Sequence, residues 1–152
     1  MSVYDVDKLM LEARKLAAQY RIATGKPLGI STEIAVHDVI RIMDLKAVEA
    51  PGHDAIGKGV REGKRIQIKG RTVSNDPKAN ERIGQIKTDQ AWDSVMLVLM
   101  NEHYEPLEIY EAQREQILQA VANTSAKRRN RGALSVAKFK HIGQLVWSAP
   151  TS

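Results

Sequence analysis

The sequence predicts an α/β domain in which helices flank a central mixed β-sheet of about five strands. Residues 6–23 and 31–44 carry apolar side chains at helical spacing. Residues 46–71 alternate short β-like runs with glycine-containing turns, and the apolar segment SVMLVLM at 94–100 precedes further helical sequence. Helices grouped before and after the strands do not follow the regular alternation of a doubly wound fold.

Length and composition indicate one compact domain. With 152 residues, 43% of them hydrophobic, the chain can bury one core of useful size but not two. We expect residues 1–148 to form this domain and residues 149–152 to be a frayed tail. The chain has no cysteine, which excludes disulfides, thiolate metal sites and a cysteine nucleophile and suits a reducing cytosol.

Charge and hydropathy indicate the class of partner. The first ten residues lack an apolar run of signal-peptide length, and segment 94–100 is too short to cross a bilayer, so we expect a soluble, cytoplasmic protein without membrane contact. The net charge of +5 favours polyanionic partners. Beyond Glu115 there is no acidic residue, and the basic tail that follows is either a solubilising surface or a nucleic-acid contact.

The N-terminal part of the chain predicts two helices. Apolar side chains recur at three- and four-residue spacing along residues 6–23, and Gly25 closes this helix. The second helix should be capped by Ser31 or Thr32 and should end near Asp44.

The middle of the chain predicts a β-meander. Its strands are KAVEA at 46–50, DAIGKGV at 54–60 and KRIQIKGR at 64–71, the last two joined by the turn REGK. The polar stretch 74–90 predicts an exposed excursion. Segment 94–100 has the continuous apolar character of a strand buried on both faces, so it should lie centrally in the sheet.

The C-terminal part predicts one more strand and two helices. EPLEIYEA at 105–112 is a partner strand, QREQILQAVANT at 113–124 a helix, and residues 135–147 a second helix that begins at Ser135. Ser135 would leave backbone amides free at this helix start, where a phosphate could bind.

The hairpin around residues 61–64 predicts a metal site. By strand alternation Gln67 and Lys69 share one face of their strand. If the chain reverses at 61–64, Asp54 comes level with Lys69, and an acid, an amide oxygen and an ammonium group converge. Mg²⁺ takes oxygen ligands and retains waters, so one or two carboxylates and a neutral oxygen suffice once a phosphate joins. The alternatives are a turn-forming aspartate and a solvated strand face.

These residues resemble a known family. Asp54 in PGHDAI, followed across the hairpin by QIK ending at Lys69, resembles the PD-(D/E)XK nuclease superfamily, the fold of many restriction enzymes and repair nucleases. Gln67 in place of the usual acid is similar to the QxK branch typified by Mrr-like restriction nucleases. Glu33 in STEIAVHDVI stands where the family's helix glutamate would be, and the element order matches along most of the chain. The motif proline, if it is Pro51, is not adjacent to Asp54.

The resemblance implies a metal-dependent DNA endonuclease, restriction-like or repair-like. It implies Mg²⁺, with Mn²⁺ able to substitute, held by Asp54, the Gln67 side chain, the Ile68 carbonyl and Glu33. Lys69 would assist the attacking water. Glu33 is equally well explained as an ordinary acid in a helix first turn. The alternative function is a catalytically inactive DNA-binding or assembly subunit with the same fold.

Double-stranded DNA is the partner that the resemblance implies. Arg71 lies on the face of Gln67 and Lys69 by alternation, and is one expected phosphate contact. The full set of expected DNA contacts comprises Arg71, Lys78, Arg82, Lys127, Arg128, Arg129, Arg131, Ser135, Lys138 and Lys140. A homodimer would suit cleavage of both strands, although no residue indicates an interface. The glycines do not have P-loop spacing, so no nucleotide cofactor is expected.

Overall fold

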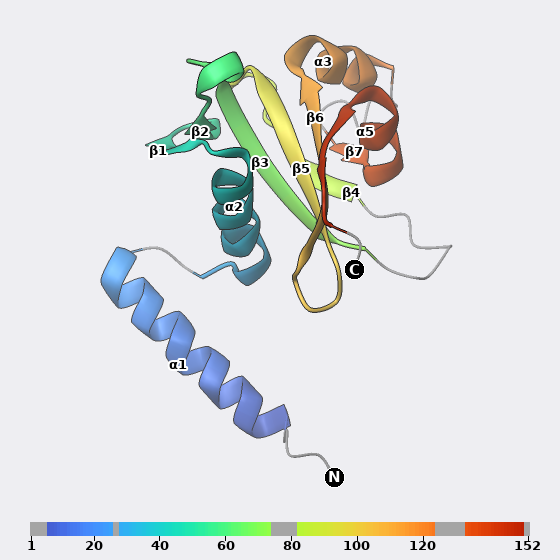
Figure 1. Ribbon diagram of the computed structural model, residues 1–152. Helices are drawn as coiled ribbons and strands as arrows, with labels where there is room; N and C mark the ends of the chain where they lie inside the picture. Colours follow the sequence, from blue (N-terminus) through green and yellow to red (C-terminus); the bar gives the residue numbers. More distant parts are fainter. Residues whose placement is uncertain (1–5, 26–27, 74–81, 124–132, 151–152) are drawn as a thin grey trace.

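The computed structural model describes residues 6–25, 28–73, 82–123 and 133–150. Within them, helices flank a mixed sheet of six strands in the order β1-β2-β3-β5-β6-β8, and β4 and β7 form a separate two-stranded sheet (Figure 1). The predicted α/β fold with a mixed sheet is therefore confirmed, with six strands in place of about five. No helix in the described ranges is both long enough and apolar enough to span a membrane.

Both N-terminal helices form as predicted. They are α1 (Val6–Thr24) and α2 (Ile30–Met43), and Asp44 ends α2 in a left-handed conformation with φ of 53°. The predicted cap at Ser31 or Thr32 is wrong. Gly29 is the N-cap, because its extended backbone lets its carbonyl accept the first helical hydrogen bond from the Glu33 amide at 2.8 Å.

The predicted meander is present. It consists of β1 (Lys46–Ala50), β2 (His53–Ile56) and β3 (Arg65–Thr72), paired antiparallel. The predicted strand 54–60 is too long, since β2 ends at Ile56 and a short 3-10 helix, η1 (Gly59–Arg61), follows. The Gly57 amide donates to the Lys64 carbonyl at 2.8 Å, and this bond closes the hairpin before the chain enters β3.

The most buried strand is β5 (Ser94–Met100), all of whose residues are buried. It lies between β3, to which it is parallel, and β6 (Pro106–Gln113), to which it is antiparallel. Its predicted central position and its predicted partner strand are both confirmed. A strand with apolar packing on both faces needs such continuous apolar sequence.

One of the two C-terminal helix predictions is wrong in part. Helix α3 (Arg114–Ala122) forms as expected, but the predicted helix 135–147 divides into α5 (Val136–Ile142) and β8 (Gln144–Ser148). Gly143 separates them, because its backbone is extended, with φ of −91° and ψ of −179°. Glycine suits this position, since a Cβ there would lie 3.0 Å from the carbonyl oxygens of Glu111 and Phe139. The chain then pairs with β6 as an outer strand of the sheet.

The predicted exposed excursion 74–90 is only partly described. Residues 74–81 lie outside the described residues. After them, β4 (Arg82–Gln85) pairs with β7 (Ala133–Ser135), and Ile83 and Ile86 are buried in the core. The prediction of exposure is wrong for Ile83 and Ile86, because only the tertiary structure brings β7 and the sheet against them, and it is confirmed for Lys87 and Asp89.

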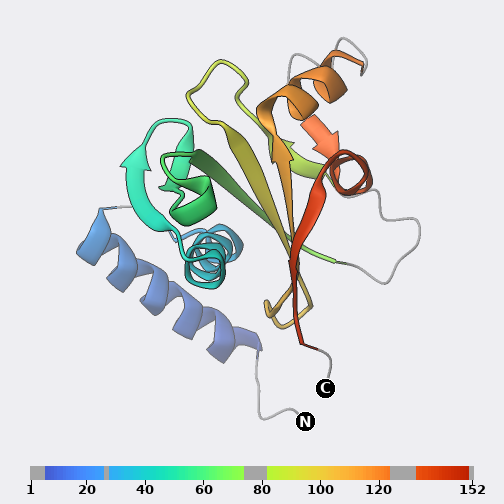
Figure 2. The same ribbon diagram turned by 45° about the horizontal axis from the view of Figure 1, so that its top comes forward.

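The two faces of the sheet carry different helices (Figure 2). Helix α2 packs on the face formed by Ile66, Ile68 and alternate residues of β5, while α3, α5 and the small sheet pack on the opposite face with Val95 and Leu97. Since Gln67 pairs with Val95 and Lys69 with Leu97, these two polar side chains point away from the α2 face.

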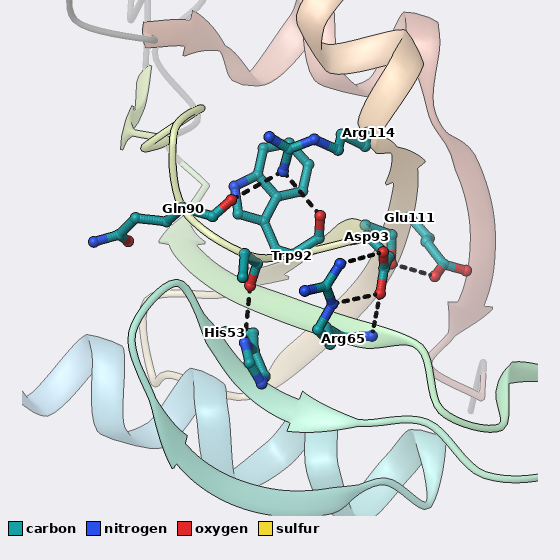
Figure 3. A network of polar contacts seen from close by, with 9 residues as sticks. His53, Arg65, Gln90, Trp92, Asp93, Glu111 and Arg114 are labelled. Atoms are coloured by element: carbon teal, nitrogen blue, oxygen red, sulfur yellow. Dashed lines mark hydrogen bonds and ion pairs between the residues drawn. The ribbon is translucent and has the colours of Figure 1, made fainter.

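An Arg65–Asp93 ion pair joins the starts of β3 and β5 (Figure 3). The Arg65 guanidinium donates to both carboxylate oxygens at 3.0 Å, and these bonds lower the pKa of Asp93 to about 2.

The stabilisation of the fold by ionised Asp93 is therefore complete above the ordinary aspartate pKa of about 3.9 and is lost as the pH falls through about 2. We expect urea midpoints to fall more between about pH 4 and pH 2 for the wild type than for Asp93→Asn. Equal falls would contradict this assignment.

Candidate active site

Four of the five catalytic and metal-binding residues selected from the sequence border one open cavity of about 230 Å³ at the end of the β2–β3 hairpin. The strand residues Asp54, Gln67, Ile68 and Lys69 all line it. The remaining lining residues come from the start of α2, the β1–β2 turn and the loop before β5: Thr32, Ala50, Gly52, His53, Lys87 and Gln90.

Asp54 owes its position to the register of the hairpin. Ala55 pairs with Ile66, so Asp54 comes opposite Gln67 and not level with Lys69, the position that was predicted. The Asp54 Oδ2 accepts a hydrogen bond from the Ile68 amide at 2.8 Å. Burial raises the pKa of Asp54 above its ordinary value, against the Ile68 hydrogen bond and the Lys69 charge, which favour the carboxylate. A buried carboxylate that is costly to ionise has a strong preference for a bound cation.

Gln67 presents a buried oxygen to the same place. Only 8% of its surface is exposed, and its Nε2 donates to the Gly52 carbonyl at 2.8 Å. A carbonyl can only accept, so this bond determines which amide atom is the oxygen. The Gln67 Oε1 is buried and finds no hydrogen-bond partner among the described residues. An unpaired buried acceptor costs about 1–3 kcal/mol, so a cation or water bound there would remove a real penalty.

Lys69 is half-buried one residue beyond Ile68. Burial lowers the pKa of its ammonium group, Arg71 and Lys87 lower it further, and Asp54 opposes the change. Lys69 is thereby closer to releasing its proton near neutral pH than a surface lysine is.

Glu33 does not line the cavity, although its neighbour Thr32 does. Its Oε2 accepts a hydrogen bond from the Tyr20 hydroxyl at 2.8 Å, and its negative charge contributes to the raised pKa of Asp54. The two carboxylates therefore interact. Tyr20 lies in α1, so its contact with Glu33 of α2 joins the two N-terminal helices.

A metal ion bound in this cavity would be coordinated by few charged ligands. The described part of the chain contains no group of three or more His, Cys, Asp or Glu side chains arranged to hold an ion. One lining carboxylate, a second carboxylate nearby and a neutral amide oxygen form a donor set of oxygens only, which suits Mg²⁺ or Mn²⁺ and not zinc.

Arg71 is already engaged with the protein. Its Nε donates to the Arg82 carbonyl and its Nη1 to the Gly70 carbonyl, both at 2.6 Å. Gly84 leaves room for the guanidinium, since a side chain there would lie 2.7 Å from Nη2. Arg71 therefore ties β3 to β4 and places a positive charge near Lys69. Arg82 itself lies in β4 and is partly exposed.

The other expected DNA contacts are either on α5 or not described. Ser135 is the N-cap of α5, as predicted, and its Oγ accepts from the Lys138 amide at 3.0 Å, so this amide already has a partner. Lys138 is exposed beside a second cavity between α3 and α5, and Lys140 lies over the Tyr110 ring at 5.5 Å. The predictions for Lys78, Lys127, Arg128, Arg129 and Arg131 lie outside the described residues.

Comparison with known proteins assigns neither a family nor a function to the chain. The chain matches no protein-family model and no curated protein sequence. The chemistry of the cavity therefore has to be inferred from its own residues. These include Lys87 and Gln90, which sequence reasoning missed, because nothing in the polar stretch 74–90 marks one lysine or glutamine from another.

Gly52 is a sensitive point of the cavity wall. Its φ is +89°, and a side chain there would lie 2.7 Å from the Gln90 Cβ and 2.9 Å from the Ala91 amide nitrogen. We expect Gly52→Ala to lower the free energy of unfolding by more than the roughly 1–2 kcal/mol of left-handed strain alone. Gly63→Ala is the matched control, because its φ is +76° and the space around it is open. Urea denaturation of both variants tests this, and equal losses would exclude the close contact.

Proposed function

We propose that this protein is a metal-dependent DNA endonuclease with a PD-(D/E)XK nuclease-like core. One observation carries the proposal. Asp54, Gln67 and Lys69, selected from the sequence for this chemistry, line the same cavity, where the Gln67 Oε1 is buried without a partner among the described residues. The element order supports it, since α2 precedes the antiparallel meander β1–β2–β3, and β5 then lies beside β3.

The donor set fits Mg²⁺. Asp54, the Gln67 Oε1 and the Ile68 carbonyl would hold the ion, with Glu33 as a further carboxylate near Asp54. When bound, such an ion acts as a Lewis acid toward the phosphodiester and increases the acidity of water. Tyr20 orients Glu33 by donating to its Oε2, which leaves Oε1 for another partner.

Lys69 is the residue proposed to handle the proton. Its lowered pKa allows the amine to accept a proton from the attacking water, and its charged form stabilises the negative charge that develops on the phosphate. Asp54 anchors the same strand end through the Ile68 amide. Hydrolysis would then break one P–O bond of the DNA backbone and form another to the water oxygen.

The electrostatics of the site suit a polyanion. Two carboxylates, Asp54 and Glu33, are accompanied by the positive charges of Lys69, Arg71 and Lys87, and the whole chain carries a net charge of +5. Double-stranded DNA is the proposed substrate. A homodimer with one site for each strand belongs to the same proposal, and the molecular mass in solution tests it.

Cleavage of DNA by the purified protein is the direct test. Supercoiled plasmid and linear phage DNA, methylated and unmethylated, are incubated with Mg²⁺, Mn²⁺ or EDTA. Lys46→Met is the matched control for Lys69→Met, because Lys46 is exposed at the start of β1, pairs with Ile56 and does not line the cavity. We expect cutting by the wild type and by Lys46→Met with either metal, and none with EDTA or by Lys69→Met. DNA binding without cutting under every condition would instead favour the binding subunit.

A further inference from the structure

The loop between β4 and β5 is held in an unusual way (Figure 3). Side chains from outside the loop donate to its backbone carbonyls. Arg114, at the start of α3, donates from Nη1 to the carbonyls of Gln90 at 3.0 Å and Trp92 at 2.9 Å, and from Nη2 to that of Thr88 at 2.6 Å. One guanidinium thus determines the path of the chain at three points.

Two further donors complete this arrangement. Within the loop, the Trp92 indole donates to the Lys87 carbonyl at 2.8 Å, and the fully buried ring lies 4.5 Å from the Arg114 guanidinium carbon. His53, next to Asp54, donates from Nδ1 to the Ala91 carbonyl at 2.8 Å. Loop 87–92 is therefore fixed through its backbone to α3 on one side and to the catalytic hairpin on the other.

Fixing a loop through its carbonyls leaves its side chains for another role. Lys87 and Gln90 both line the cavity. Lys87 is exposed, and among the described residues its ammonium makes no hydrogen bond or ion pair. It nevertheless lies close enough to Lys69 for its charge to lower the pKa of Lys69. Irregular loops are ordinarily among the least stable parts of a fold, so this degree of support needs a reason.

We propose that Lys87 binds a phosphate group of the substrate at the cavity, and that Arg114 is the positioning residue that holds the loop from which Lys87 projects. The geometry distinguishes Lys87 from the other cations of the site. Arg71 already donates to two carbonyls, and Lys69 is half-buried beside Asp54, whereas Lys87 is exposed at the cavity rim. The inference rests on the proposed function, since the phosphate is taken to be that of a nucleic acid.

Salt dependence of DNA binding tests Lys87. Anisotropy of a fluorescent duplex is measured in EDTA, where no cleavage occurs, between about 50 and 200 mM salt. Removing one phosphate contact should reduce the slope of log K against log salt by about 0.9. We expect this reduction for Lys87→Gln and an unchanged slope for the control Lys46→Gln. An unchanged slope for Lys87→Gln overturns the inference.

A double-mutant cycle tests Arg114. Arg114→Lys keeps the charge but cannot span three carbonyls, so the loop should shift and the slope should fall as it does in Lys87→Gln. The variant that combines both changes should show no further fall. If Arg114→Lys only lowers the melting temperature and leaves the slope unchanged, the positioning role is excluded. Trp92→Phe, which removes the indole donor and keeps a ring, gives the same test if Arg114→Lys does not fold.

The outcomes separate this inference from the proposed function. If the wild type binds duplex DNA with a Lys87-dependent slope of log K against log salt but does not cut it with Mg²⁺ or Mn²⁺, the phosphate contact is supported and the proposed hydrolysis is wrong. If it cuts and the slope does not depend on Lys87, the hydrolysis stands and the contact falls. If the wild type does not bind duplex even at low salt, both fall.

Discussion

Asp54→Asn is expected to abolish DNA cleavage and at the same time to raise the stability of the fold. Burial raises the pKa of Asp54 in the folded protein, so its contribution to stability is complete below the ordinary value of about 3.9 and is lost as the pH rises through the folded pKa. At neutral pH the carboxylate is therefore a cost. Asparagine removes the charge, and its oxygen can still accept from the Ile68 amide. Cleavage should fall by at least about 10³-fold, because several kcal/mol of metal stabilisation are lost.

Thermal melting with and without Mg²⁺ measures both halves of this result. In EDTA at neutral pH, Asp54→Asn should melt at a higher temperature than the wild type. Added Mg²⁺ should raise the melting temperature of the wild type and leave that of Asp54→Asn unchanged. Asp44→Asn is the matched control, since Asp44 is exposed at the end of α2 and asparagine tolerates its left-handed backbone. A lower melting temperature for Asp54→Asn in EDTA would contradict the prediction that the ionised, buried Asp54 carboxylate destabilises the fold.

Glu111→Ala is expected to cost about 3–5 kcal/mol of unfolding free energy, the largest loss of stability predicted for a single substitution here. Glu111 in β6 is only 5% exposed. It accepts from the Ser94 hydroxyl at 2.8 Å and from the Arg61 Nε at 3.0 Å, and it pairs with the Lys64 Nζ at 3.3 Å. Alanine would leave two largely buried cations and a buried hydroxyl without their acceptor.

The pH dependence of Glu111 follows from the same contacts. Burial acts to raise its pKa, but the hydrogen bonds from Ser94 and Arg61 and the charge of Lys64 outweigh it and lower the pKa overall. The contribution of Glu111 is therefore present above the ordinary glutamate pKa of about 4.3 and is lost as the pH falls through the folded value. Urea denaturation at neutral pH measures the loss. Glu108→Ala, on the same strand but half-buried, is the control, and a loss no greater than that of the control would show that the cluster is not important for stability.

Glu111 also connects the stability of the fold to the candidate site. Arg61 and Lys64 belong to the turn of the β2–β3 hairpin, whose other end carries Asp54 and Lys69. Because both strands of a hairpin share one register, holding the turn against β6 also holds Asp54 opposite Gln67 and keeps Lys69 two residues further along β3. The contacts of Glu111 with Arg61 and Lys64 therefore support the geometry of the candidate site as well as the stability of the fold.

Local sequence patterns predict the hairpin and the polar face of β3. Strand alternation puts Gln67 and Lys69 on one side, and the turn predicted at residues 61–64 returns the chain so that Asp54 meets them. These relations are local, so periodicity and turn chemistry are enough to predict them. The same is true of α1, of α2 and of the fully buried β5, whose patterns extend over whole elements.

Contacts between residues far apart in the sequence determine the rest of the candidate site. Residues 135–147 have helical spacing throughout, yet Gly143 ends α5, because the Glu111 carbonyl lies against it and β6 offers an edge for β8. Lys87 and Gln90 line the cavity from a loop whose carbonyls at Thr88 and Gln90 accept hydrogen bonds from Arg114, which is remote in sequence. Arg71 was predicted by strand alternation to lie on the substrate face, but its guanidinium donates to the carbonyls of Arg82 in β4 and Gly70 in β3. Such partners lie far apart along the chain, and local sequence patterns do not predict which of them will be in contact.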